Sequence, residues 1–150
     1  MDMLVHGNEK VDLGGLNEAP GFMLRLAQLK VFENFFSEVG GRGLKPGEFS
    51  VLWVIRNNPG IRQSILGQSL MIKRAHMTKL IRALEDRNLL SRNIPDEDRR
   101  AVELTLTSMG KTEAEAASEW FFAYEQGVGA ALSEAEREQL LALLRKFIGI

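Results

Sequence analysis

The sequence predicts a mainly α-helical fold of the α+β class with one small β-hairpin. Apolar residues recur at helical spacing in several segments, and two short apolar runs flank a charged turn at residues 95–100. Two short helical segments come directly before that turn and its strands. This is the order of a winged helix–turn–helix, here with additional helices at both ends of the chain.

The first third of the chain contains one expected helix. Residues 1–20 are polar and glycine-bearing without clean periodicity, which predicts a partly ordered arm. Apolar positions between Phe22 and Val39 follow helical spacing, so a helix is expected over residues 21–39. The glycines that follow it are expected to end this helix.

Three helices are expected before the hairpin. Pro46 is a favourable first-turn residue for a helix that ends at the turn cluster 57–60. Further helices are expected over residues 63–69 and 73–87. Asn88 then falls where a left-handed residue is needed to end a helix, a position that asparagine tolerates.

The last third of the chain is expected to be helical. Thr107 is a capping residue for a helix that extends to about Gln126. Ser133 and Glu136 have the spacing of a capping box at the start of a final helix with a broad apolar face. The length of the chain is typical of one domain, so a single domain over residues 1–150 is expected.

Composition limits the class of protein. Apolar residues make up 45% of the chain and charged residues 26%, as in ordinary globular proteins. The absence of cysteine excludes a disulfide framework, a thiolate metal site and a cysteine-based redox switch. No segment approaches the roughly 20 apolar residues of a membrane span, and no leader is recognised, so we expect a cytoplasmic protein without a membrane partner.

The charge is unevenly distributed along the chain. Residues 61–100 contain nine basic and five acidic residues, whereas the remainder contains ten basic and fifteen acidic residues. A basic segment on an acidic chain is expected of a phosphate-binding surface. The alternative is an ordinary solvated surface of mixed charge.

The expected helix over residues 73–87 has the two faces that a helix in the major groove of DNA needs. Its apolar residues recur at i, i+3, i+4 and i+7 and form one face. The residues that we expect to contact DNA are Lys73, Arg74, Ala75, His76, Thr78, Lys79 and Arg82. Lys79 suits a guanine edge, whereas Arg74 and Arg82 suit phosphates.

The expected hairpin provides a second DNA-binding element. Acidic residues in its turn would repel DNA if they faced it, so Asp98 is interpreted as a partner that holds Arg100 extended by a charge-assisted hydrogen bond. An arginine at such a tip can enter a narrow A·T-rich minor groove, and Arg99 beside it belongs to the same expected surface. The alternative is a solvated turn whose ion pairs contribute little.

The central part of the chain resembles the MarR (multiple antibiotic resistance regulator) family of bacterial transcription factors. The matching segments are residues 49–55, 58–60, 80–85 and 98–110. In the last segment, Asp98, Arg100 and the run Leu106-Thr107 followed by Gly110 match the wing signature of the family. The resemblance extends over about residues 20–148.

The resemblance implies a homodimer that represses transcription and is released by a ligand. Residues 21–39 and 108–148 would be the dimerisation helices, residues 46–106 the winged helix–turn–helix, and residues 1–20 an N-terminal arm. Each protomer would place one helix in successive major grooves of a pseudo-palindromic operator, with half-sites about 10 bp apart.

The resemblance also implies a small-molecule effector, usually anionic and often aromatic. The residues that we expect to bind it are Phe22, Arg25, Leu26, Lys30, Phe36, Arg42, Phe49, Trp53 and Tyr124. The Pro-Gly-Phe-x-Leu-Arg opening of the first helix resembles a branch that controls aromatic-acid catabolism, which suggests an aromatic acid or its CoA thioester. The alternative is that these side chains form only the core and the dimer interface.

An enzyme and a protein–protein interaction module are the two other classes of protein to compare with the sequence. The two histidines, His6 and His76, lie in unrelated segments, and no metal-binding, nucleophile or phosphate-loop motif is present, so neither an enzyme nor a cofactor or metal is expected. A winged helix used only for protein–protein contacts or dimerisation, without DNA binding, is the remaining alternative.

Overall fold

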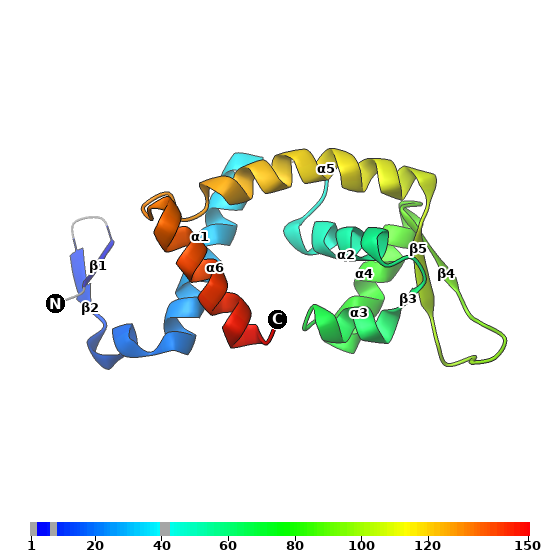
Figure 1. Cartoon of the computed structure of the whole chain (residues 1–150), viewed down its shortest axis with the longest axis horizontal. Helices are drawn as coiled ribbons and strands as arrows, with labels where there is room; N and C mark the ends of the chain where they lie inside the picture. Colours follow the sequence, from blue (N-terminus) through cyan, green and yellow to red (C-terminus); the bar gives the residue numbers. More distant parts are fainter. Residues whose placement is uncertain (1–2, 7–8, 40–42) are drawn as a thin grey trace. The chain divides into compact units, whose positions relative to one another are not determined.

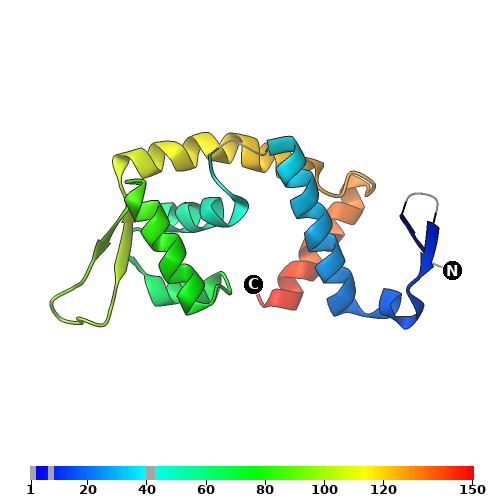
Figure 2. The same ribbon diagram turned by 180° about the vertical axis from the view of Figure 1, so that it is seen from behind.

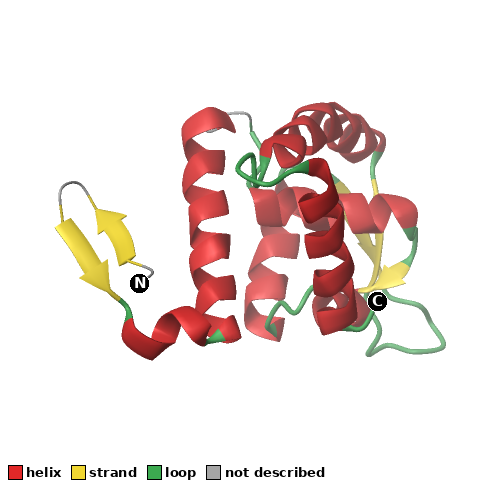
Figure 3. Ribbon diagram, turned by 60° about the vertical axis from the view of Figure 1, so that its left-hand side comes forward, coloured by secondary structure: helices red, strands yellow, loops and turns green. Residues whose placement is uncertain are grey.

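The computed structural model describes residues 3–6, 9–39 and 43–150. Helices predominate and strands are few, which confirms the predicted mainly α-helical fold with a small β-hairpin (Figure 3). The sequence predicts one domain, whereas the chain divides into two compact units, Met1–Gly40 and Gly41–Ile150. The division falls in the glycine-rich segment that follows the first long helix.

The first unit contains a hairpin, a 3-10 helix and one long helix. Strand β1 (Met3–His6) pairs antiparallel with β2 (Glu9–Asp12), and η1 (Gly14–Glu18) and α1 (Pro20–Val39) follow. The side chain of Asp12 accepts a hydrogen bond of 2.8 Å from the N–H of Gly14, which joins the hairpin to η1. The sequence predicts a partly ordered arm over residues 1–20, and it did not predict the hairpin, because this segment shows no clean alternation of apolar and polar residues.

The second unit carries the remaining elements (Figure 1). They are α2 (Pro46–Asn57), β3 (Ile61–Arg62), α3 (Gln63–Ser69), α4 (Arg74–Asp86), β4 (Leu90–Asn93), β5 (Glu103–Leu106), α5 (Ser108–Gly127) and α6 (Glu134–Ile148). Each of these helices was predicted from the sequence. In the described part of the chain, no helix is long and apolar enough to cross a membrane.

The sheet of the second unit has three antiparallel strands in the order β3-β5-β4. Leu90 of β4 faces Leu106 of β5, and Ile61 of β3 faces Leu104 on the other side of β5. Residues 94–102 form the loop that joins β4 to β5, and this loop extends past the helices (Figure 2). It is called the wing below. Strand β3 was not predicted, because its two residues form a strand only through their pairing with β5.

The core of the second unit is formed by one face of each surrounding element. On α4 the buried residues are Met77, Ile81 and Leu84, whose spacing at i, i+4 and i+7 places them on a single face. Fully burying such a side chain contributes about 1.5–3 kcal/mol. The opposite face of α4 is therefore held outward by the burial of its apolar side.

Local caps fix the junction between α4 and α5. Asn88 has a φ of 56°, which confirms the predicted left-handed residue after α4. The hydroxyl of Thr107 accepts a hydrogen bond of 2.9 Å from the N–H of Gly110 and donates one of 2.6 Å to the carbonyl of Asn88. The predicted cap of α5 is thus confirmed, and the same side chain ties the end of α4 to the start of α5.

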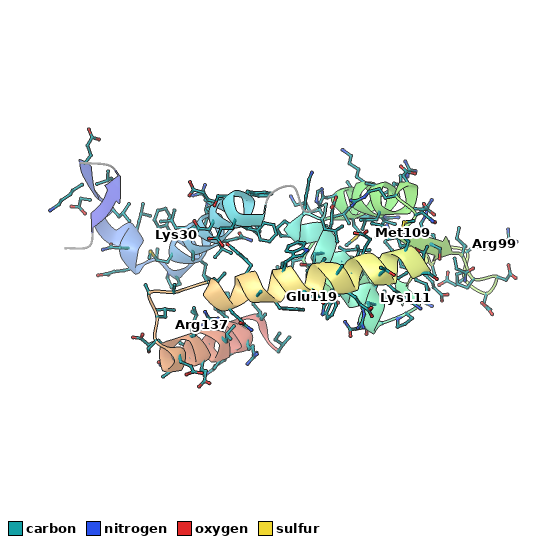
Figure 4. All side chains as sticks on the ribbon, turned by 90° about the horizontal axis from the view of Figure 1, so that it is seen from above. Lys30, Arg99, Met109, Lys111, Glu119 and Arg137 are labelled. Atoms are coloured by element: carbon teal, nitrogen blue, oxygen red, sulfur yellow. The ribbon has the colours of Figure 1, made fainter. Side chains whose placement is uncertain are left out.

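The last helix begins at the predicted capping box. The N–H of Ser133 donates to the Glu136 carboxylate at 2.8 Å, and the N–H of Glu136 donates to the Ser133 hydroxyl at 3.3 Å. Arg137, one residue further on, donates to the carbonyl oxygens of Gln126, Val128 and Glu125, so α6 caps the end of α5 (Figure 4).

Candidate nucleic-acid interface

The outward face of α4 carries the residues predicted to enter the major groove. Lys73 is the N-cap, with an extended backbone, and the helix begins at Arg74. Six of the seven predicted residues are exposed, namely Lys73, Arg74, Ala75, His76, Lys79 and Arg82. Thr78 is half-buried, and its hydroxyl donates to the carbonyl of Arg74 at 3.0 Å, so its oxygen remains available only as an acceptor.

The wing turn is organised by Asp98, in a manner that differs from the prediction. Its Oδ1 accepts a hydrogen bond of 3.1 Å from the backbone N–H of Arg100 rather than from the guanidinium. Its Oδ2 lies 3.7 Å from Nη1 of Arg62, at the end of β3. Asp98 therefore shapes the turn around Arg100 and joins it to the sheet, because Arg62 of the neighbouring strand takes the ionic contact.

The two arginines that follow Asp98 have different surroundings. Arg99 lies at the outer end of the wing (Figure 4) and is exposed. Arg100 is also exposed, but it lines a hollow that faces α3 and the start of α4. Arg99 is not among the residues that line this hollow.

Ion pairing divides the nine basic residues of the segment 61–100 into two groups. Three form ion pairs: Arg62 with Asp98, Arg87 with Glu48 at 3.1 Å, and Arg92 with Glu85 at 2.7 Å. The other six are exposed and, within the described residues, form no ion pair; they are Lys73, Arg74, Lys79, Arg82, Arg99 and Arg100. These six are the cations of the predicted DNA-binding set, and their charge is available to phosphates.

Arg87 has a structural task. Besides pairing with Glu48, it donates to the carbonyl of Gly43 at 2.9 Å. Glu48 also accepts the N–H of Lys45 at 3.1 Å and so satisfies a free donor at the start of α2. The end of α4 is thereby fastened to the start of α2.

A hollow of about 740 Å³ lies between α3, the start of α4 and the wing. Its cationic lining residues are Lys73, Arg74 and Arg100, and α3 adds the polar side chains of Gln63, Ser64 and Gln68. No carboxylate is among the described residues that line it. Sequence reasoning assigned no role to α3, although its polar residues beside a basic helix were a signal that could have been used.

The aromatic residues of the second unit pack on one another. Phe49 is 2% exposed, and its ring stacks on Phe121 with centroids 4.2 Å apart and on Trp53 with centroids 5.6 Å apart. Phe122 meets Trp53 edge-on at 5.4 Å. Phe49 is therefore a core residue, in agreement with the alternative interpretation of the predicted ligand set.

The remaining predicted ligand residues lie in both units. Phe22, Arg25, Leu26, Lys30 and Phe36 are on α1, of which Arg25, Lys30 and Phe36 are exposed. Trp53 and Tyr124 are half-buried on α2 and α5, and Arg42 lies outside the described residues. That these side chains form one effector site stays a prediction. Among the described residues, no group of three or more metal-ligating side chains comes together.

Comparison with known proteins decides the family. A model described as the MarR family matches residues 44–102, the segment that contains α2 to the wing. A Thauera aromatica protein, named for transcriptional regulation of the hcr operon, is 33% identical over 144 residues, which cover 95% of this chain and 82% of that protein. This chain belongs to the MarR family.

Solved structures of MarR-family regulators share the fold. The repressor CouR bound to a 23-mer DNA duplex is 33% identical, covers 93% of this chain and 99% of its own, and has a TM-score of 0.83. CouR bound to p-coumaroyl-CoA is 32% identical, covers 91% and 96% of the two chains, and has a TM-score of 0.79. This MarR-family chain is thus a DNA-binding transcriptional regulator with a winged helix–turn–helix, and not an enzyme.

Proposed function

We propose that this regulator is a cytoplasmic, homodimeric repressor that binds a pseudo-palindromic operator and is released by an aromatic acid or its CoA thioester. The observation that carries the DNA-binding surface is the group of six exposed cations that form no ion pair with any described residue: Lys73 at the N-cap of α4, three on α4 itself and two on the wing. Cations that are already paired with carboxylates would displace few counterions from the phosphates of DNA. These six have no such pairing, so they can displace counterions when they bind phosphates.

The exposed apolar surface of α6 supports the homodimer. No residue of α6 is buried, and its large apolar residues include Leu140, Leu141, Leu143, Phe147 and Ile148, which are 45–70% exposed. A helix with this much exposed apolar surface is typical of an interface. A second copy of the chain would cover it and would set the distance between the two α4 helices.

The class of effector is proposed from the relatives. CouR, which is 32% identical over most of both chains, has been solved with p-coumaroyl-CoA. The exposed cations Arg25 and Lys30 on α1 suit the carboxylate of an aromatic acid or the phosphates of a CoA thioester. A ligand can release the repressor only if it binds the DNA-free conformation more tightly than the DNA-bound one.

The DNA-binding surface is tested with a labelled duplex that the wild-type protein selects from a random-sequence library. Arg100→Ala is expected to lose about 1–3 kcal/mol of binding free energy and to reduce the slope of log K against log salt by about one. Lys111→Ala, which removes the same charge from an exposed position on α5, is the matched control and is expected to bind like the wild type. Equal loss in both variants would contradict the proposed surface.

The effector is tested on the same complex. p-Coumaroyl-CoA and p-coumaric acid are titrated separately into the protein–duplex complex, and release is followed by fluorescence anisotropy. Release by either compound supports an aromatic effector and shows whether the thioester is needed. No release at saturating concentrations of both would contradict it.

A further inference from the structure

We propose that the open edge of β2 pairs with the same edge of a second copy of the chain, so that two hairpins form one four-stranded antiparallel sheet. This pairing rests on the proposed homodimer and adds to it a contact that α6 does not make. It involves residues to which neither DNA binding nor effector binding has been assigned.

The hairpin of β1 and β2 has an unpaired edge on each side. Among the described residues of the first unit no third strand lies beside it, and all four residues of β2 are exposed (Figure 3). A two-stranded hairpin is only marginally stable in water, and additional strands stabilise it. An open edge presents N–H and C=O groups that can pair with another strand.

The register of the hairpin determines which residues of β2 present these groups. His6 lies opposite Glu9, and two residues separate them along the chain. The residues that flank a two-residue connection form a hydrogen-bonded pair, and bonded and non-bonded pairs then alternate. Val11 therefore directs its N–H and C=O toward β1, whereas Lys10 and Asp12 direct theirs outward. In the described part of the chain, Lys10 and Asp12 make no other backbone–backbone hydrogen bond.

The charges on β2 select one register for the pairing of two copies. Hydrogen bonds between the two edges require that outward-directed residues lie opposite each other. Lys10 can then face Lys10, Asp12 can face Asp12, or Lys10 can face Asp12. The first two registers place like charges directly opposite each other, whereas the third forms two symmetric pairs of opposite charge. The third register is therefore the favoured one.

This register also aligns apolar positions across the sheet. With Lys10 opposite Asp12, Val11 lies opposite Val11 of the second copy. Leu4 lies opposite Val11 within each hairpin, so four apolar positions form one row across the four strands. The side chain of Val11 is 47% exposed in the single chain, and the second copy would cover part of it.

The charged side chains of β2 are available for this contact. Within the described residues, Lys10 and Asp12 form no ion pair. Oδ1 of Asp12 accepts the N–H of Gly14 at 2.8 Å, which holds the carboxylate at the end of β2 and leaves Oδ2 for the lysine of the second copy.

Symmetry places the contact on the axis of the homodimer. A residue that meets its own copy lies on a two-fold axis, and a homodimer has one such axis. Strands of four residues are too short to hold two chains together alone. The α6 interface would supply the high local concentration of the second copy that the pairing needs.

The absence of cysteine from the chain allows a direct test of the register. Val11→Cys introduces a single thiol, and its Cα would lie about 4.5 Å from that of the second copy, a distance that a disulfide can span. In glutathione buffer the two thiols are oxidised to one disulfide while one oxidised glutathione is reduced to two thiols. The fraction of linked chains at equilibrium is measured on non-reducing gels.

Glu9→Cys is the matched control for the disulfide. Glu9 is exposed on the same strand, and its substitution leaves Lys10 and Asp12 in place. In the proposed register the two copies of this position are more than about 10 Å apart, too far for a disulfide. The effective concentration of the second thiol is expected to be at least tenfold higher for Val11→Cys. Equal values, or no disulfide in Val11→Cys, would overturn the proposal.

A second experiment tests the charge pairs. Lys10→Glu, combined with Val11→Cys, places a carboxylate opposite Asp12 of the second copy and is expected to lower the effective concentration at least fivefold. Lys111→Glu makes the same change of charge at an exposed position of α5 and is expected to leave it unchanged. If the two combined variants formed the disulfide equally well, the charges would not set the register.

Light scattering separates this proposal from the homodimer on which it rests. If the wild type has the mass of a dimer and Val11→Cys shows no excess over Glu9→Cys, only the pairing of the hairpins is wrong. If the wild type has the mass of a single chain, the homodimer is wrong, and the pairing with it. Linked Val11→Cys is expected to keep the mass of a dimer, and a larger mass would overturn the placement on the dimer axis.

Discussion

Oδ2 of Asp98 lies 3.7 Å from Nη1 of Arg62, so the wing turn is joined to the first strand of the sheet. The other carboxylate oxygen of Asp98 accepts the backbone N–H of Arg100. Both contacts position the backbone from which the side chain of Arg100 extends. Asp98 is thus a positioning residue for the wing, and its two oxygens have separable tasks.

Substitutions of Asp98 are expected to differ in their effect on DNA affinity. Asp98→Asn retains an oxygen for the N–H of Arg100 and loses only an exposed ion pair, whose contribution is at most about 1 kcal/mol, or fivefold in affinity. Asp98→Ala also loses the hydrogen bond, which adds about 0.5–1.5 kcal/mol. Anisotropy titrations with the selected duplex measure both variants.

Arg62→Gln is the companion variant for this prediction. It removes the same ion pair from the other side and is expected to match Asp98→Asn. If Asp98→Asn were as impaired as Asp98→Ala while Arg62→Gln bound like the wild type, the ion pair would not support the wing.

The two contacts of Asp98 also mark the limit of sequence reasoning. The contact with Arg100 lies within one turn, so the sequence predicted the pairing of these residues, although not that the backbone N–H is the donor. The contact with Arg62 depends on the pairing of β3 with β5, and a strand of two residues has no local signal. The Thr107 cap and the left-handed Asn88 were predictable because each depends on residues close in sequence, whereas the hydrogen bond that joins the two was not predicted.

Gly110 is expected to tolerate no side chain. A Cβ built on it would overlap the carbonyl oxygen of Leu89, because α5 passes close to the start of β4. Gly110→Ala is therefore expected to destabilise the protein by about 3 kcal/mol, since backbone atoms must move apart.

Gly127 provides the matched control for that substitution. It lies on the same helix with nothing within 4 Å of its added Cβ, so Gly127→Ala is expected to be neutral or to stabilise by up to about 0.5 kcal/mol. Urea unfolding at a fixed protein concentration measures both variants. Equal stability of the two alanine variants would contradict the close approach at Gly110.

Phe147 is expected to control assembly. Its side chain is 70% exposed on α6, so Phe147→Lys does not disturb the core of the protomer, and a cation near the end of a helix is favoured by the helix dipole. In a dimer interface the same lysine would be buried without a partner, which is expected to weaken association at least tenfold. Light scattering at low micromolar concentration is expected to give the mass of a single chain.

Glu138→Gln is the control for assembly. It changes the net charge by the same amount and lies about 180° from Phe147 around α6, at roughly 100° per residue. The control is expected to retain the mass of a dimer. A Phe147→Lys variant that also keeps this mass would show that this face of α6 is not the interface.

Glu125 is expected to make the stability of the protein depend on pH. Burial at the end of α5 raises the pKa of its carboxyl above the ordinary value, and the charge of Arg137 lowers it in part. Because the folded state binds this proton more tightly than the unfolded chain, the carboxylate lowers stability as the pH rises from about 4.5 through the raised pKa. Glu125→Gln removes this cost, so its melting temperature should exceed that of the wild type at pH 7, and the difference should vanish near pH 3.

Glu119→Gln is the control, because Glu119 is an exposed position on the same helix. Its melting temperature should equal that of the wild type at both pH values. A Glu125→Gln variant that also melted like the wild type at both pH values would contradict the cost assigned to the burial of Glu125.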